Sequence, residues 1–253
     1  MNLDSNVIEF KKRQEKTRTN NFKLLLFIGV IVLILLMLLK SRLFNISMVE
    51  IEGINHYSEE EIYKIIGIDN KTNIFELMVR DNVKHMEYDA FISNIDIKYS
   101  LPSSISINVK ERKIIGYVPY MGTYLCLDKD GLILKDTPYI EGEYPVIEGL
   151  KFDEFSVGQV LQTKDKESFI CMLQLVQAFE KYEILSKIQK VNLHDCNNII
   201  LETNTIKANF GNIDEFDKKV NILSQAISIM PTSKKGIIDL QDPDKPIVFK
   251  NYR

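Results

Sequence analysis

The sequence predicts an α+β protein with an N-terminal transmembrane helix, a small module of order β-α-α-β-β, and a mixed α/β second domain with a largely antiparallel sheet. Two observations carry this prediction: one apolar run near the N-terminus, and downstream segments that change between a period of two and a helical period. We expect a basic cytoplasmic tail over residues 1–23, the transmembrane helix over 24–43, the first outer module over 44–112 and the second over 113–253.

The apolar run from Leu24 to Leu39 contains no charged residue, no polar side chain and no proline. Its sixteen residues rise by about 24 Å, so flanking apolar residues and lysine stems must complete the ~30 Å hydrocarbon core. No pair of small residues at A-x-A spacing follows the run, which favours an uncleaved signal anchor over a cleaved signal peptide. The residues that we expect to contact lipid are Leu24, Phe27, Ile31, Leu35 and Leu39.

The charges on either side of the run predict its orientation. Six cationic residues precede it, whereas only Lys40 and Arg42 follow it closely. Positive flanks stay in the cytoplasm, so we expect a cytoplasmic N-terminus and outer modules that lie outside the cell membrane. The basic tail can also contact anionic membrane lipid. The six residues of this topology signal are Lys11, Lys12, Arg13, Lys16, Arg18 and Lys23.

Composition limits the partners of the outer part. After residue 42 the chain carries 32 acidic and 24 basic residues, a net charge near −8, which argues against nucleic acid. The cysteines, Cys126, Cys171 and Cys196, show no C-x-x-C spacing and predict neither a disulfide framework nor a zinc site. One bridge or three unpaired thiols both remain open.

The first outer module begins with an alternating strand, Val49–Glu52, before Gly53. Ser58 and Glu61 form a capping box that starts a helix, and Thr72-Asn73 offers a cap for a second helix. Two further alternating runs, at 95–99 and 105–109, predict a hairpin. A three-stranded sheet with both helices on one face would bury the apolar stripes.

The second outer module begins with a hairpin around Asp130-Gly131, where the Asp-Gly pair supplies the positive φ of a tight turn. Amphipathic helices are expected over about 164–181 and 214–230. Strands are expected at 188–193, 198–202, 205–210, 236–240 and 246–249.

These features together resemble the FtsQ/DivIB cell-division family. Gly53 after the first strand, Leu101-Pro102, and the run Ile105-x-Ile107-x-Val109-x-Glu111-Arg112 resemble the family's POTRA domain. The hairpin, the stretch 144–149 and the closing Ile238-Asp239-Leu240 are similar to the β domain that follows it. The family usually has a proline shortly after the Glu-Arg pair, whereas this chain has Lys113 and Ile114.

No set of residues predicts catalysis. The three histidines, His56, His85 and His194, are scattered, and the G-x-S-x-G, H-E-x-x-H and phosphate-loop motifs are absent from the sequence. The run Asp128–Gly131 does not fit a calcium loop, because Cys126 and Thr137 would stand where carboxylates belong. We therefore expect no enzyme activity, no cofactor, no metal and no small-molecule substrate.

The resemblance implies a non-enzymatic, single-pass scaffold at the division septum. Its implied partners are single-pass coiled-coil division proteins of the FtsB/DivIC and FtsL kinds, and through them it would regulate septal peptidoglycan synthesis. The alternative is a membrane-anchored extracytoplasmic enzyme that acts on the cell wall.

An exposed edge strand gives a physical route to partner binding, because it can accept a partner strand through main-chain hydrogen bonds. The last strand is the candidate, and an ordinary paired strand of the sheet is the alternative. The predicted contact residues are Ile247, Val248, Phe249, Asn251 and Tyr252.

Overall fold

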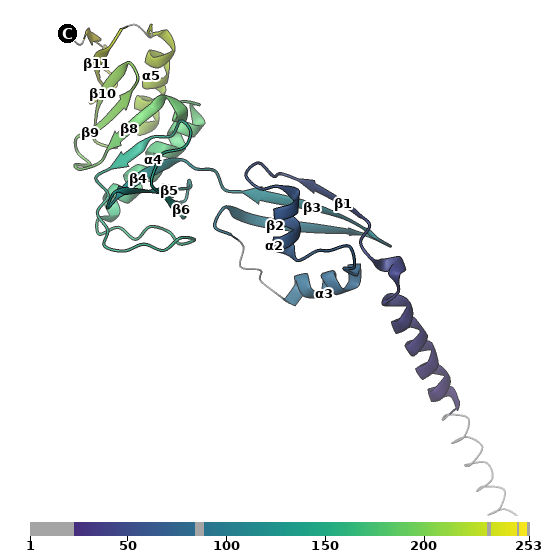
Figure 1. Ribbon diagram of the computed structural model, residues 1–253. Coiled ribbons are helices and arrows are strands. Elements are labelled where there is room, and N and C mark those ends of the chain that lie inside the picture. The colour runs from purple at the N-terminus through teal and green to yellow at the C-terminus, as the bar shows by residue number, and fades with distance from the viewer. Residues whose placement is uncertain (1–22, 84–88, 232–233, 247, 252–253) are drawn as a thin grey trace, which may run out of the picture. The chain divides into compact units, whose positions relative to one another are not determined.

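The computed structural model describes residues 23–83, 89–231, 234–246 and 248–251 of the chain (Figure 1). The chain divides into two compact units, one formed by Met1–Glu87 and Ile95–Val109 and the other by Tyr88–Asn94 and Lys110–Arg253. Each unit has its own sheet, with three strands in the first and nine in the second.

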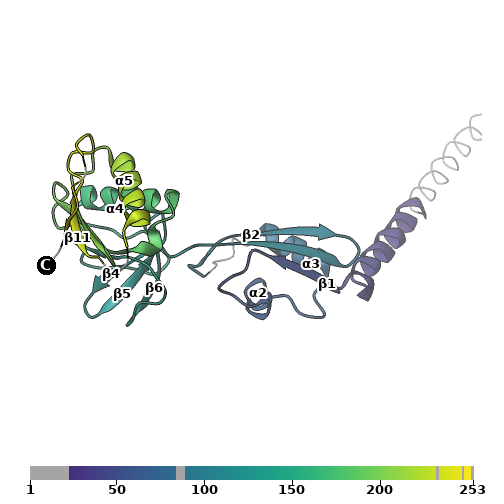
Figure 2. The same cartoon turned by 90° about the horizontal axis from the view of Figure 1, so that it is seen from above.

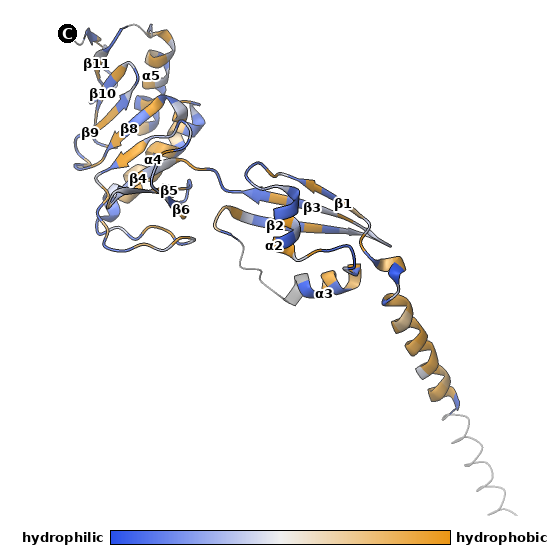
Figure 3. Cartoon of the chain, viewed as in Figure 1, coloured by the Kyte–Doolittle hydropathy of each residue, from blue (hydrophilic) through white to orange (hydrophobic). Residues whose placement is uncertain are grey.

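The apolar run forms a helix over residues 23–39, and in Figure 3 most of this helix has the colour of hydrophobic residues. Leu24, Phe27, Ile31 and Leu35 are exposed on it, and Leu39 is half-buried. Among the described residues, no helix combines the length and the apolar character that a membrane crossing requires. Of the predicted topology residues only Lys23 is described; Lys11, Lys12, Arg13, Lys16 and Arg18 lie outside the described residues.

The helix ends at residue 39, four residues before the predicted boundary at 43. After Lys40, Ser41 has an extended backbone, and the short 3-10 helix η1 (Arg42–Phe44) follows it. The side-chain amide of Asn73 donates to the carbonyl oxygen of Leu39 at 2.9 Å, which satisfies one of the carbonyl groups that a helix end leaves free.

The first unit has the order β1 (Met48–Glu52), α2 (Glu59–Ile66), α3 (Ile74–Val83), β2 (Ile92–Ser100) and β3 (Ser104–Glu111). Its strands lie in the order β1-β3-β2, and β1 runs parallel to β3. Both helices cover one face of the sheet (Figure 2), where Ile105, Ile107 and Val109 alternate as buried residues of β3.

The predicted caps of both helices are confirmed. The Ser58 amide donates to Glu61 Oε2 at 2.9 Å, and the Glu61 amide donates to Ser58 Oγ at 3.3 Å. The Ser58 hydroxyl also donates to Glu61 Oε2, at 2.8 Å, and the hydrogen bonds from the Ser58 amide and hydroxyl hold the pKa of the Glu61 carboxyl below its usual value. At α3, Asn73 Oδ1 accepts from the Phe75 amide at 2.9 Å.

The second unit contains a nine-stranded mixed sheet in the order β12-β11-β10-β9-β8-β7-β4-β5-β6. Strand β7 lies parallel to both β4 and β8, and β11 lies parallel to β10, while the remaining neighbours are antiparallel. The strands are β4 (Gly116–Tyr120), β5 (Thr123–Leu127), β6 (Ile133–Thr137), β7 (Val146–Glu148), β8 (Ile188–Asn192), β9 (Ile199–Thr203), β10 (Ile206–Gly211), β11 (Gly236–Asp239) and β12 (Lys250–Asn251).

Helices α4 (Lys166–Lys181) and α5 (Phe216–Ile229) lie side by side over one face of this sheet (Figure 2). Their apolar stripes contribute Met172, Phe179 and Leu223 to the core, all fully buried. The two helices cover a face of the sheet and not its two edges, which are formed by β12 and β6.

Candidate partner-binding edge

Strand β12 forms one edge of the nine-stranded sheet. It contains two residues, Lys250 and Asn251, and both are exposed. It pairs antiparallel with β11 through Ile237↔Lys250 and Gly236↔Asn251. The last strand predicted from the sequence is therefore present at an edge, but its hydrogen-bonded part lies at 250–251 rather than at 246–249.

The predicted contact residues differ in their positions. Val248 is 61% exposed just before β12, whereas Phe249 is half-buried and packs against the core. Asn251 is on the edge strand itself. Ile247 and Tyr252 lie outside the described residues.

Gly236 leaves room for the Phe249 ring and for β12. The sequence analysis did not predict this role. A Cβ atom at Gly236 would lie 2.1 Å from Phe249 Cζ and 2.6 Å from the carbonyl oxygen of Lys250. The absence of a side chain at Gly236 thus lets the Phe249 ring lie directly on β11. One sequence signal could have indicated this contact: a glycine stands at the first position of a strand and is followed by two β-branched residues, Ile237 and Ile238.

The main-chain groups of β12 point in directions that follow from the register. The Gly236 amide donates to the Thr205 carbonyl oxygen at 3.0 Å, so the hydrogen-bonding groups of Gly236 face β10. Successive residues of a strand direct these groups to opposite sides, so those of Ile237 face β12. Lys250, paired with Ile237, directs its groups back to β11, and Asn251 directs its amide and carbonyl outward from the sheet.

Ion pairs hold the loop that leads into β12. Lys218 of α5 forms an ion pair with Asp244, and Lys245 Nζ lies 2.9 Å from Asp242 Oδ2. The hydrogen bond from Lys245 is the largest cause that lowers the pKa of the Asp242 carboxyl from its usual value. The hydrogen bond to Asp244 in turn raises the pKa of Lys218.

At the opposite edge of the sheet, the first residue of β6 is covered by another segment of the chain. The Ile133 amide donates to the Gln159 carbonyl at 2.9 Å, and the Gly158 amide donates to the Ile133 carbonyl at 2.8 Å. Leu132 and Val160 form an antiparallel bridge beside them. The loop 156–161 therefore occupies the start of this edge, whereas no described segment pairs with the outer side of β12.

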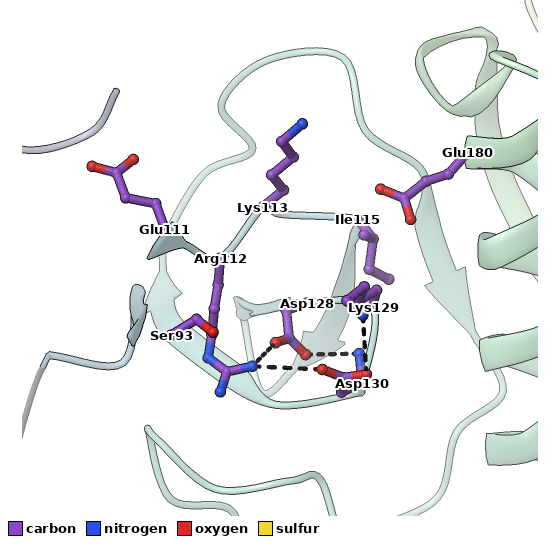
Figure 4. Close-up of a pocket in the computed structure, with 9 residues that line it drawn as sticks. All are labelled: Ser93, Glu111, Arg112, Lys113, Ile115, Asp128, Lys129, Asp130 and Glu180. Carbon is purple, nitrogen blue, oxygen red and sulfur yellow. Dashed lines mark hydrogen bonds and ion pairs between the residues drawn. The ribbon is translucent and has the colours of Figure 1, made fainter. Parts of the chain in front are cut away.

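A charged cavity of about 360 Å³ lies near the turn that joins β5 and β6 (Figure 4). Arg112 Nη1 lies 2.6 Å from Asp128 Oδ2, and Asp128 is only 2% exposed. Asp128 Oδ1 also accepts from the amides of Asp130 and Leu132, at 2.9 and 2.8 Å. Because these donors occupy the Asp128 carboxylate, it is placed to hold the β5–β6 turn rather than to move a proton.

The sequence analysis singled out Arg112 only as part of the Glu111-Arg112 pair, and its contact with Asp128 was missed. A basic residue at the end of β3 and an aspartate sixteen positions later gave no signal of contact. Among the described residues, no group of three or more His, Cys, Asp or Glu side chains is placed to hold a metal ion.

Comparisons with known proteins find a matching domain family and several similar cell-division proteins. The model of the FtsQ-type POTRA domain matches residues 44–112. The cell division protein DivIB of Clostridium tetani is 29% identical over 217 residues, which cover 83% of this chain and 81% of the relative. DivIB of Clostridium botulinum strain Hall is 25% identical over 254 residues, which cover 95% of each chain.

Solved structures also include a similar chain. The major extracytoplasmic domain of DivIB from Geobacillus stearothermophilus aligns with 48% of this chain and 90% of its own length. The alignment has 18% sequence identity and a TM-score of 0.29.

Proposed function

Because this chain belongs to the FtsQ/DivIB family of non-enzymatic cell-division proteins, we propose that it binds and positions other division proteins at the septum. The partners proposed are single-pass coiled-coil proteins of the FtsB/DivIC and FtsL kinds. Through these contacts the chain would regulate septal peptidoglycan synthesis. Membership in a family of division proteins without catalytic activity also removes the alternative of a wall-degrading or wall-building enzyme.

The apolar helix supports a proposal for location. Its side chains over residues 24–36 are about half exposed or more, and no part of the described chain covers them. We place this helix and the residues up to 43 in the cell membrane, with the basic residues before Leu24 in the cytoplasm. The two modules would then lie outside the cytoplasm.

The edge strand β12 carries the proposal for partner binding. Its two exposed residues end the sheet, and the Asn251 amide and carbonyl face outward. An extended segment of a partner can extend the sheet there, with main-chain hydrogen bonds for affinity and neighbouring side chains for specificity. Val248, exposed beside the strand, is placed to contact such a segment.

A matched pair of substitutions at Asn251 tests this binding mode. Asn251→Pro removes the outward amide hydrogen and puts a ring in the path of an added strand, while Lys250 keeps its pairing with Ile237. Asn251→Ala keeps the amide hydrogen and removes only the side chain. The measurement is the affinity of the full chain in detergent for the ectodomain of a DivIC-like partner.

We expect Asn251→Pro to weaken binding by roughly 10-fold, the equivalent of about one main-chain hydrogen bond, and Asn251→Ala to change it less than about 2-fold. Equal affinities of the two variants would show that the partner does not pair with this edge.

A further inference from the structure

Two of the three cysteines lie together in the second unit. Cys171 is on α4 and is 2% exposed, and Cys196 is half-buried in the turn that follows β8. Both are free thiols in the structure, as is the buried Cys126 of β5. Cys171 and Cys196 come from different layers of the fold, the helices and the sheet.

The geometry around the two thiols is defined by α4. Ser168 precedes Cys171 by three positions on the helix, so the two side chains lie on the same face. Ser168 Oγ lies 3.4 Å from Cys196 Sγ, which places the Cys196 thiol beside the turn of α4 that carries Cys171. The Cys196 thiol thus sits against one turn of α4.

Both sides of this contact are fixed. Ser168 Oγ donates to Asp165 Oδ2 at 2.6 Å, and Asp165 also caps the first turn of α4. On the other side, the Asn197 amide donates to Asp195 Oδ1 at 2.9 Å, which shapes the turn that carries Cys196. Hydrogen bonds of their own therefore hold both the helix turn and the loop turn that carry the two thiols.

We propose that Cys171 and Cys196 form a disulfide bond that locks α4 to the turn after β8 when the protein meets a disulfide oxidant. The proposal does not rest on the division function, although an outer module would meet such oxidants more readily than a cytoplasmic one.

The reaction proceeds by thiol–disulfide exchange with a small disulfide such as oxidised glutathione. The more accessible Cys196 thiolate attacks one sulfur of the oxidant, forms a mixed disulfide and releases one glutathione thiolate. The Cys171 thiolate then attacks Cys196 Sγ and releases the second. The two cysteines lose two electrons and two protons, and one glutathione disulfide is reduced to two thiols.

Burial raises the pKa of the Cys171 thiol to about 12, so little of it is thiolate at neutral pH. The second exchange step should therefore limit the rate. Below pH 10 the rate of bond formation should rise by about 10-fold per pH unit, in proportion to the thiolate fraction.

The experiment uses the full chain in detergent, incubated with oxidised glutathione at pH 8.5 and then alkylated in denaturant. Peptide mass spectrometry should find Cys126 alkylated and the Cys171 and Cys196 peptides joined. The bond closes a loop with 24 residues between the two cysteines, so it should raise the Tm by about 5–10 °C.

Two variants serve as controls. Cys126→Ser should leave the cross-link in place, and Cys196→Ser should abolish both the cross-link and the gain in Tm. Three alkylated cysteines in the folded wild type, a stable glutathione adduct on Cys196, or a bond that includes Cys126 would each overturn the proposal. Mapping of the wild-type protein decides the question even if a variant fails to fold.

Discussion

The nine-stranded sheet has two edges, β6 and β12. A loop of the chain pairs with the start of β6, whereas β12 is exposed. At β6 the loop 156–161 pairs with the strand through the Ile133 amide and carbonyl, so a further strand finds these groups occupied. At β12 two exposed residues end the sheet. Proteins commonly cover or interrupt edge strands to avoid unwanted pairing, so the open edge is the one suited to a partner.

The same comparison separates residues that we expect to support only the fold from residues that we expect to support the proposed partner binding. Near β6, the buried Asp128 carboxylate joins Arg112 to the β5–β6 turn. Near β12, Gly236 and Phe249 fix a strand that buries little surface of its own. Substitutions at Asp128 should therefore reduce only the stability of the fold, whereas substitutions at Gly236 should also reduce partner binding.

The largest effect on binding is expected from Gly236→Ala. The added methyl group would overlap the Phe249 ring and the Lys250 carbonyl, so β12 must leave β11. We expect partner affinity to fall roughly 100-fold, the equivalent of two or three main-chain hydrogen bonds, and the free energy of unfolding to fall by about 2 kcal/mol. Titration calorimetry and urea denaturation followed by tyrosine fluorescence measure the two quantities.

Gly158→Ala is the control at the opposite edge. Gly158 has φ +83°, and a Cβ there meets no atom within 4 Å. The strained backbone should cost about 1 kcal/mol of stability with no change in affinity. A loss of affinity in Gly158→Ala comparable to that in Gly236→Ala would remove the distinction between the edges.

Asp128→Ala should give the largest loss of stability without a loss of binding. It leaves the half-buried Arg112 guanidinium without its closest partner and two turn amides without their acceptor. We expect the free energy of unfolding to fall by about 3 kcal/mol. Asp130→Ala removes a more exposed carboxylate 3.6 Å from Arg112 and should cost less than about 1 kcal/mol. Weaker partner binding by folded Asp128→Ala protein would contradict the assignment of roles.

The smallest effect concerns pH. The pKa of Asp242 is lower in the folded protein than its ordinary value of 3.8, so its contribution to stability is fully present above that value and is lost as the pH falls through the folded pKa. Its ion pair with Lys245 holds the loop before β12. Partner affinity of the wild type should therefore be constant from pH 7 to pH 5 and decrease slightly below about pH 4.

Asp242→Asn is the control for this pH effect. It lacks the titrating carboxylate and should show the slightly lower affinity at every pH. If the affinity of the wild type changed with pH in parallel with that of Asp242→Asn, the ion pair between Asp242 and Lys245 would not influence partner binding at β12.

Local chemistry explains which elements could be predicted from the sequence. The capping box at Ser58 and Glu61 and the Asp-Gly turn at 130–131 depend on neighbours within four residues, and both are present. Strand β4 was not predicted, because its turn to β5 is Met121-Gly122. Gly122 has φ +90°, but Met121 has φ +44°, at a position where Asn, Asp or Gly usually marks such a turn in the sequence.

Contacts between distant residues explain what could not be predicted. The position of the last strand depends on the Phe249 ring over Gly236, and the helix end at Leu39 depends on Asn73, 34 positions away. The contact of Arg112 with Asp128 and the place of Cys196 beside the turn that carries Cys171 likewise arise only from the fold. Periodicity indicates which face of an element is buried, but it does not indicate which element lies against it.

Hydrogen exchange of the full chain, measured with and without the partner ectodomain, tests the central claim most directly. If a partner strand pairs with β12, the amide of Asn251 should become strongly protected on binding, while the amides of β6 keep the same exchange rates. Binding that leaves Asn251 unprotected, or that protects β6 instead, would contradict the account.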